Sequence, residues 1–225
     1  MNEHSSPKQK EHVLEMVIND FDVGPIVHDG YYPISLKTSR GILECRYYAS
    51  AERRRAVVFA GDTRGGWDSP VRNILYPGLC NDLSRHNINC LRIKYRYPEN
   101  LAESILDVLA GVTFLAQDGV ETIGLVGHGF GGAASIQAAA ASPLVSTVVS
   151  LSTYIFGTEA VRDFRETQSL FVIENDDSPI PIFDSIFDQA HEPKVLLHMK
   201  ESSHDFNEAA PEVYFAIKDW LYKKI

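Results

Sequence analysis

The chain has 225 residues, and 44% of them are hydrophobic, which suffices for one buried core but not for two full domains. Its 30 acidic residues outnumber its 21 lysines and arginines, which gives a formal net charge of -9 at pH 7. Because a negatively charged surface repels phosphate backbones and anionic lipid headgroups, nucleic acids and membranes are poor candidate partners.

The cysteines and the N-terminal residues indicate a reduced, intracellular chain. Cys45, Cys80 and Cys90 are an odd number and form no CxxC pair, so neither a disulfide framework nor a structural zinc site is expected. The first ten residues are polar and charged and do not lead into an apolar stretch, so no secretory signal is visible. We therefore expect a cytoplasmic protein.

The first thirty residues are interpreted as an N-terminal extension, whose apolar patch, Val13–Ile18, is expected to pack on the domain as a strand or as a helix. Ile34–Lys37 and Ile42–Tyr48, separated by Ser39-Arg40-Gly41, predict a hairpin of two strands. Short apolar runs typical of parallel strands then alternate with helical segments. The predicted strands are Ala56–Ala60, Cys90–Tyr95, Thr122–Val126, Val145–Leu151, Leu170–Ile173 and Val195–Met199, and the predicted helices are Ser69–His86, Leu101–Gln117, Phe130–Ala141, Gly157–Phe164, Ile182–Ala190 and Asn207–Lys223.

A hairpin followed by alternating strands and helices predicts one α/β domain over residues 31–225. Its sheet should be doubly wound and mostly parallel, with about eight strands. No long insertion follows the Val145–Leu151 strand, so we expect no large cap domain and a site that is open or covered by short loops.

A glycine-dense turn joins the predicted Thr122–Val126 strand to the predicted Phe130–Ala141 helix. From Gly124 its sequence is G-L-V-G-H-G-F-G-G-A-A. In a nucleophile elbow, G-x-S-x-G, flanking glycines let the strand and the helix approach closely. In a dinucleotide-binding fold, G-x-G-x-x-G cradles a phosphate but belongs near the start of the fold. Here the turn follows the fifth predicted strand, which favours the elbow.

On these residues the chain resembles the α/β-hydrolase family, and the small ester and dienelactone hydrolases within it. G-H-S-x-G-G is a common form of the family's elbow, and Gly129 stands where the family places its serine nucleophile. The segments Gly66–Pro70 and Tyr95–Pro98 resemble the same small hydrolases. The resemblance implies an α/β-hydrolase fold and hydrolase or esterase-like chemistry in a pocket above Gly129.

The resemblance also implies the two other members of a catalytic triad. Asp177 matches the family's acid best, in the acidic turn after the Leu170–Ile173 strand, and Asp176 is the alternative. His204, after the Val195–Met199 strand, matches the histidine. The chain order of nucleophile, acid and histidine is that of this family. The plainer interpretations are an Asp-rich turn or helix cap and a lone surface histidine.

By the same resemblance the oxyanion hole consists of two backbone N–H groups, those of Phe130 and Asp62. The Asp62 side chain would repel a developing oxyanion unless it is turned away or paired, for instance with Arg64. The candidate substrate-binding residues are Trp67, Tyr154 and Phe206, with Phe130 beside them.

Gly129 offers no atom for attack on an acyl carbon, so the usual acyl-enzyme route is closed. The nearest hydroxyl, Ser135, lies six residues on and should sit more than one helical turn below the site. Four interpretations remain. In the first, the chain is a non-hydrolytic binding module, or pseudoenzyme. In the second, Asp177 and His204 act as a base in elimination or cyclisation. In the third, His204 activates a water in the space of the missing serine, and in the fourth, glycine is an engineered replacement in an ordinary serine hydrolase.

We therefore expect a hydrolase-family protein that binds or acts on a small acyl or ester-like molecule, with a catalytically silent ligand-binding module as the alternative. No metal or organic cofactor is expected, because the sequence has no ligand cluster at metal spacing. The expected partner is a small-molecule ligand or substrate, with neither nucleic acid nor membrane, and a homodimer is left open.

Overall fold

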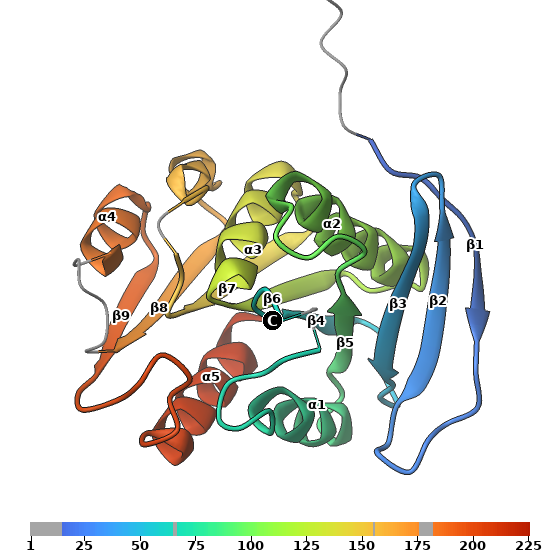
Figure 1. Cartoon of the computed structure of the whole chain (residues 1–225), viewed down its shortest axis with the longest axis horizontal. Coiled ribbons are helices and arrows are strands. Elements are labelled where there is room, and N and C mark those ends of the chain that lie inside the picture. The colour runs from blue at the N-terminus through green and yellow to red at the C-terminus, as the bar shows by residue number, and fades with distance from the viewer. Residues whose placement is uncertain (1–14, 65–66, 155, 176–181) are drawn as a thin grey trace, which may run out of the picture.

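A nine-stranded mixed sheet crosses the molecule, with helices on both of its faces (Figure 1). The computed structural model describes residues 15–64, 67–154, 156–175 and 182–225, without the side chains of residues 182–185. The strands are β1 (Ile18–Val23), β2 (Tyr32–Thr38), β3 (Gly41–Tyr48), β4 (Arg55–Ala60), β5 (Asn89–Lys94), β6 (Thr122–His128), β7 (Val145–Leu151), β8 (Ser169–Asn175) and β9 (Lys194–Met199). The helices are α1 (Leu75–Arg85), α2 (Leu101–Gln117), α3 (Phe130–Ala141), the short 3-10 helix η1 (Glu159–Asp163), α4 (Ile182–Gln189) and α5 (Ala210–Lys224).

The strands lie in the order β1-β2-β3-β5-β4-β6-β7-β8-β9. β1, β2 and β3 pair antiparallel, β3 is antiparallel to β5, and all pairs from β5 to β9 are parallel. The short Ser39-Arg40 turn permits only an antiparallel return, whereas parallel neighbours need long crossovers, most of which here contain a helix. β1 belongs to the first thirty residues, so part of that stretch is an edge strand of the sheet.

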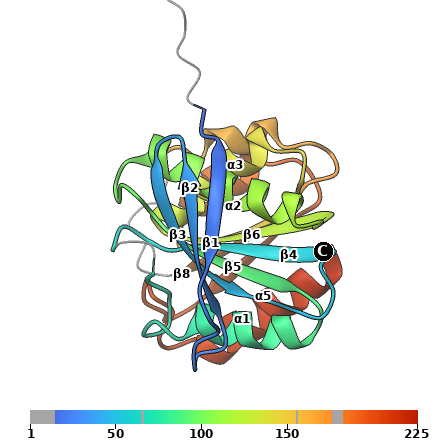
Figure 2. The same cartoon turned by 90° about the vertical axis from the view of Figure 1, so that its right-hand side faces the viewer.

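Two helical layers bury the central strands on both faces. α2, α3 and α4 lie on one face of the sheet, and α1 and α5 lie on the other (Figures 1 and 2). Val58 in β4 faces α2, while its neighbour Val57 belongs to the core on the α1 and α5 side. Burial on both faces explains why these runs are continuously apolar. The predicted doubly wound, mostly parallel α/β sheet is confirmed, with nine strands among the described residues.

Some predicted elements have different limits or a different form. α1 begins at Leu75 and not at Ser69, because Val71, Arg72 and Asn73 have φ values of +56°, +51° and +66° and cannot continue a right-handed helix. The predicted Gly157–Phe164 helix is reduced to η1. In the apolar patch Val13–Ile18, residues 13 and 14 lie outside the described residues, and the strand starts only at Ile18.

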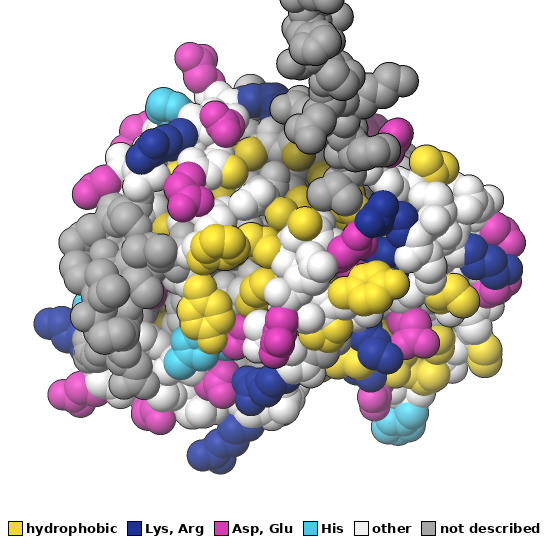
Figure 3. Space-filling model, turned by 45° about the horizontal axis from the view of Figure 1, so that its top comes forward, with side chains coloured by type: hydrophobic (Ala, Val, Ile, Leu, Met, Phe, Trp, Pro, Cys, Tyr) yellow, Lys and Arg dark blue, Asp and Glu magenta, His cyan; other side chains and the backbone are white. Residues whose placement is uncertain are grey.

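Acidic and basic side chains are interspersed over the face shown in Figure 3, with hydrophobic side chains between them. Over the described ranges of the chain, no helix combines the length and the apolar character needed to cross a lipid bilayer.

The carboxyl ends of the parallel strands lie side by side at one edge of the sheet. Ala60 in β4 pairs with Gly127 in β6, and His128 pairs with Leu151 in β7. The loops that leave these ends therefore converge. Open α/β sheets bind their ligands at such an edge.

Candidate active site

The turn between β6 and α3 has the tight geometry that its glycines predict. Gly129 has φ +54° and ψ -115°, a conformation that side-chain-bearing residues rarely adopt. A Cβ atom on Gly127 would collide with the carbonyl oxygen of Gly131, and one on Gly131 would collide with that of Gly61. The glycines thus bring α3 against β6 and against the loop that follows β4.

The side chain of Asp62 fills the space next to Gly129. A Cβ atom added to Gly129 would lie 2.7 Å from Oδ1 of Asp62 and 2.8 Å from its Cγ. Oδ1 accepts a hydrogen bond from the Phe130 N–H at 3.0 Å, and Oδ2 accepts one from the Tyr154 hydroxyl at 3.3 Å. A carboxylate therefore occupies the volume that a serine side chain at position 129 would need.

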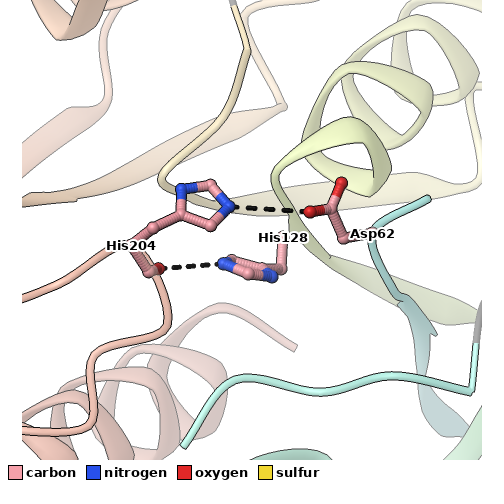
Figure 4. Close-up of side chains that lie close together, drawn as sticks. All are labelled: Asp62, His128 and His204. Carbon is pink, nitrogen blue, oxygen red and sulfur yellow. Dashed lines mark hydrogen bonds and ion pairs between the residues drawn. The ribbon is translucent and has the colours of Figure 1, made fainter. Parts of the chain in front are cut away.

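His204 faces the same carboxylate from the loop after β9 (Figure 4). Its Nε2 lies 3.6 Å from Oδ2 of Asp62. The Tyr154 ring stacks on the His204 ring, with centroids 5.6 Å apart and planes 6° apart. About a third of the His204 side chain is exposed, whereas only 8% of the Asp62 side chain is. His204 and Tyr154 therefore lie between the buried carboxylate and solvent.

A second histidine, His128, lies buried beneath His204. The two ring centroids are 4.5 Å apart, and Nε2 of His128 donates to the His204 carbonyl oxygen at 3.0 Å (Figure 4). Because a carbonyl only accepts, this hydrogen bond requires the proton on Nε2. Burial lowers the pKa of His128, and the neighbouring His204 lowers it further. His128 is thus a neutral support that fixes the backbone position of His204.

Polar contacts with His204 and with the Phe130 N–H keep Asp62 ionised despite its burial. Burial by itself would raise the pKa of Asp62, but the His204 imidazole 3.6 Å away and the hydrogen bond from the Phe130 N–H outweigh it and lower the pKa to about 2. Burial and the adjacent Asp62 charge raise the pKa of Tyr154, so its hydroxyl remains a donor. The site therefore contains a permanent carboxylate anion beside an imidazole.

Both backbone N–H groups predicted for an oxyanion hole already donate hydrogen bonds to aspartate side chains of the protein. The Phe130 N–H is bound to the Asp62 side chain, and the Asp62 N–H is bound to Oδ2 of Asp68 at 2.5 Å. Arg64, named above as one possible partner of Asp62, contacts Asp205 at 3.2 Å. The Asp62 side chain is turned into the site and not away from it.

Of the predicted substrate-binding residues, Tyr154 and Phe130 contact the Asp62 carboxylate directly. The Phe206 side chain is completely buried in the core on the α1 and α5 side, where its ring centroid lies 6.4 Å from that of His128. Trp67 packs under the guanidinium of Arg46, 4.1 Å from the ring centroid. Asp177 and its alternative Asp176 lie outside the described residues.

Two features of the site escaped the sequence analysis. His128 was visible only as the variable residue of a glycine motif, and nothing in that motif predicts an imidazole under His204. Asp62 was identified for its N–H group, whereas its carboxylate is the group at the centre of the site. The sequence signal for this arrangement was the combination of glycine at 129 with an acidic residue at 62, because the missing side chain of Gly129 leaves space for the Asp62 carboxylate.

One carboxylate and two imidazoles are also a donor set that zinc accepts. Ligand atoms of Asp62, His128 and His204 lie within 4.8 Å of one another, and Nδ1 of His128 has no hydrogen-bond partner among the described residues. However, Nε2 of His128 already donates to the His204 carbonyl oxygen, so only one ring nitrogen of His128 is available for an ion. The site therefore contains both a close carboxylate–imidazole contact between Asp62 and His204 and a possible zinc ligand set.

No protein-family model and no curated protein matches the sequence. Solved structures do match the fold. The dienelactone hydrolase of Anabaena variabilis aligns with a TM-score of 0.75 at 18% identity, over 87% of this chain and 98% of that one. An acetyl xylan esterase from a Paenibacillus species gives a TM-score of 0.73 at 11% identity, over 93% and 90% of the two chains. A lidless α/β serine hydrolase from Xanthomonas campestris gives 0.65 at 19%, over 89% and 97%. The chain therefore has the α/β-hydrolase fold, as its glycine-rich turn predicted.

Proposed function

We propose that the chain is a hydrolase of small acyl or ester-like molecules in which the Asp62 carboxylate and His204 replace a serine and its histidine. One observation carries the proposal: the Asp62 carboxylate lies in the space of the missing residue-129 side chain and faces His204 at 3.6 Å. We infer that the turn after β6 is a nucleophile elbow whose reactive group comes from the neighbouring loop.

The chemistry of the two groups supports a hydrolytic role. Glycine at position 129 closes the acyl-serine route, but an ionised carboxylate can act as a nucleophile or as a base, and an imidazole can transfer protons in the same reaction. The Phe130 N–H stabilises negative charge at Oδ1 of Asp62. The solved structures of similar fold include proteins named as a dienelactone hydrolase and an acetyl xylan esterase, which favours ester-like substrates.

A second candidate is a catalytically silent binding module. It is favoured by the two occupied donors, because a ligand carbonyl cannot reach the Phe130 N–H unless Asp62 moves away. This alternative predicts ligand binding without turnover.

The experiment is a turnover assay on aryl acetates and small lactones, with the protein beside its Asp62→Ala and His204→Ala variants and with Asp22→Asn and His28→Ala as controls. Asp22 and His28 are exposed, and they lie in the edge strand β1 and in the segment between β1 and β2. Turnover that falls at least ~100-fold in both site variants, and in neither control, supports the proposal.

The assay is repeated after dialysis against a chelator, because the three clustered side chains are also potential zinc ligands. Activity that survives dialysis assigns the reaction to the protein groups, whereas activity that is lost and returns with zinc assigns it to a metal centre. Ligand binding without turnover of any substrate would establish the silent module instead.

A further inference from the structure

We propose that Asp62 is itself the covalent nucleophile, and that its substrates are small lactones or alkyl esters attacked at the saturated carbon bonded to the ester oxygen. The inference rests on the function proposed above and specifies its first chemical step. It places the nucleophile of this site on the loop after β4, while the turn after β6 supplies the space and the Phe130 N–H that binds Oδ1.

The two carboxylate oxygens of Asp62 have different surroundings. Oδ1 is held by the Phe130 N–H at 3.0 Å, at the base of the turn. Oδ2 faces His204 at 3.6 Å and the Tyr154 hydroxyl at 3.3 Å, and both of these residues are partly exposed to solvent. Oδ2 is therefore the oxygen that a substrate meets, and Oδ1 is the one that can keep its hydrogen bond throughout the reaction.

The nature of the nucleophile selects the carbon that it attacks. A carboxylate that attacks an acyl carbon yields a mixed anhydride, which lies well above the starting ester in free energy. A carboxylate that attacks a saturated carbon yields another ester, so the step is nearly balanced. The leaving group is then the carboxylate of the opened lactone, which needs no proton, and no general acid is required.

The first step forms a bond between Oδ2 and the saturated carbon and breaks the bond from that carbon to the ring oxygen. The electron pair of the broken bond stays on the ring oxygen as the product carboxylate. Asp62 is now an alkyl ester, whose carbonyl oxygen is Oδ1. Its hydrogen bond to the Phe130 N–H is already in place for the second step.

In the second step a water adds to Cγ of Asp62 and gives a proton to His204, while the negative charge develops on Oδ1. Collapse breaks the bond between Cγ and Oδ2, and the departing alkoxide takes the proton from His204. Asp62 is left as an acid and loses its proton to solvent, because its pKa is about 2. The sum is lactone plus water to hydroxycarboxylate plus a proton.

The reaction leaves two marks that ordinary acyl attack does not. Displacement at the saturated carbon inverts its configuration, so (R)-β-butyrolactone should yield (S)-3-hydroxybutyrate. In ¹⁸O-labelled water under single-turnover conditions, the label should enter the Asp62 side chain and not the product. Retained configuration, or label in the product of the first turnover, would overturn the proposal while leaving Asp62-dependent hydrolysis intact.

The covalent intermediate should accumulate when its hydrolysis is blocked. In His204→Ala the first step needs no base and should stay within ~10-fold, while product release should fall ~10³-fold. Intact-mass measurement should then show an increase of one lactone, and peptide mapping should locate it on Asp62. The double variant Asp62→Asn/His204→Ala should show no increase, and His28→Ala should turn over without accumulation.

The outcomes separate this inference from the proposed function. Hydrolysis that requires Asp62 and His204 but gives no adduct in His204→Ala contradicts the nucleophile and keeps the hydrolase. If His204→Ala does not fold, rapid quenching of the unaltered protein with the lactone takes its place, and absence of the Asp62 adduct during turnover is the contradicting result. Absence of all turnover overturns both.

Discussion

Asp62, just after β4, and Glu174, within β8, are both buried, with 6% and 1% of their surface exposed, yet they are held in opposite charge states. Burial raises the pKa of Glu174 to about 8, and the Thr153 backbone N–H offsets this only in part. Asp62 faces the His204 imidazole and accepts a hydrogen bond from the Phe130 N–H, and its pKa is lowered to about 2. The comparison shows that the donors around a buried carboxyl, and not its depth, decide whether it is an anion.

The sharpest way to break this comparison is to remove the charge at each position in turn. Asp62→Asn keeps the shape of the side chain but cannot form an ester, so ester turnover should fall about 10³-fold. Glu174→Gln should leave turnover within about 3-fold at neutral pH, because the native side chain is already uncharged there. Values of kcat/KM for the two variants decide it, and equal losses would show that burial alone matters.

A side chain at position 129 tests how closely the Asp62 region is packed. Gly129→Ser places Cβ 2.7 Å from the Asp62 carboxylate at a φ of +54°, so we expect a loss of about 3–4 kcal/mol in the free energy of unfolding.

Asp62→Ala in the same chain should recover about 1–3 kcal/mol of that loss. Urea unfolding of the four members of the cycle measures this coupling. If the changes in the free energy of unfolding of the two substitutions are additive, the Asp62 carboxylate and the serine side chain do not compete for the same space. A histidine-dependent acyl-enzyme in the double variant would further identify the turn as a nucleophile elbow.

The Glu174 region should respond to pH in the direction opposite to that of an ion-paired carboxylate. Since its folded pKa is raised, the stabilisation of the neutral form is complete below pH 4.5 and is lost as the pH rises toward 8. Glu174→Gln should therefore raise the free energy of unfolding by about 2–3 kcal/mol more at pH 8 than at pH 4.5. Glu212→Gln, at an exposed position of α5, is the matched control, and a pH-independent difference would contradict the prediction.

The smallest expected effect concerns the second donor to Oδ2 of Asp62. Tyr154→Phe removes one hydrogen bond of 3.3 Å from a half-exposed side chain, so turnover should change by less than about 10-fold and stability by about 1 kcal/mol. Steady-state kinetics with a small lactone measure it. A loss as large as that of Asp62→Asn would make the hydroxyl a participant in the reaction.

Local patterns predicted most of the fold because hydrophobic periodicity and glycine positions determine it. The predicted limits of α2 and α3 agree with the structure, and so does the strand Val145–Leu151. The start of α1 was not predicted correctly. Residues 71–73 have left-handed backbone conformations, and contacts with distant loops hold them, such as the hydrogen bond from the Val71 N–H to the Asp205 carbonyl oxygen.

The site was predictable only in part, for a related reason. His204 follows from its position after the last strand, whereas the direction of the Asp62 side chain depends on Phe130, Tyr154 and His204, all far away in the sequence. Phe206 was assigned to the pocket from its place in a loop, but its φ of +55° accompanies a side chain buried in the core. Loop placement predicts proximity but not the direction of a side chain.

The interlocking of Asp62 with Gly129 has an evolutionary consequence. Restoring a side chain at 129 while Asp62 is present creates a collision, and shortening Asp62 while Gly129 is present leaves a hole under His204. Each single replacement is unfavourable by itself, so a return to a serine enzyme would require both residues to change together. Among relatives of this chain, we expect glycine at 129 to occur with an acidic residue at 62, and serine at 129 with a small or differently oriented residue at 62.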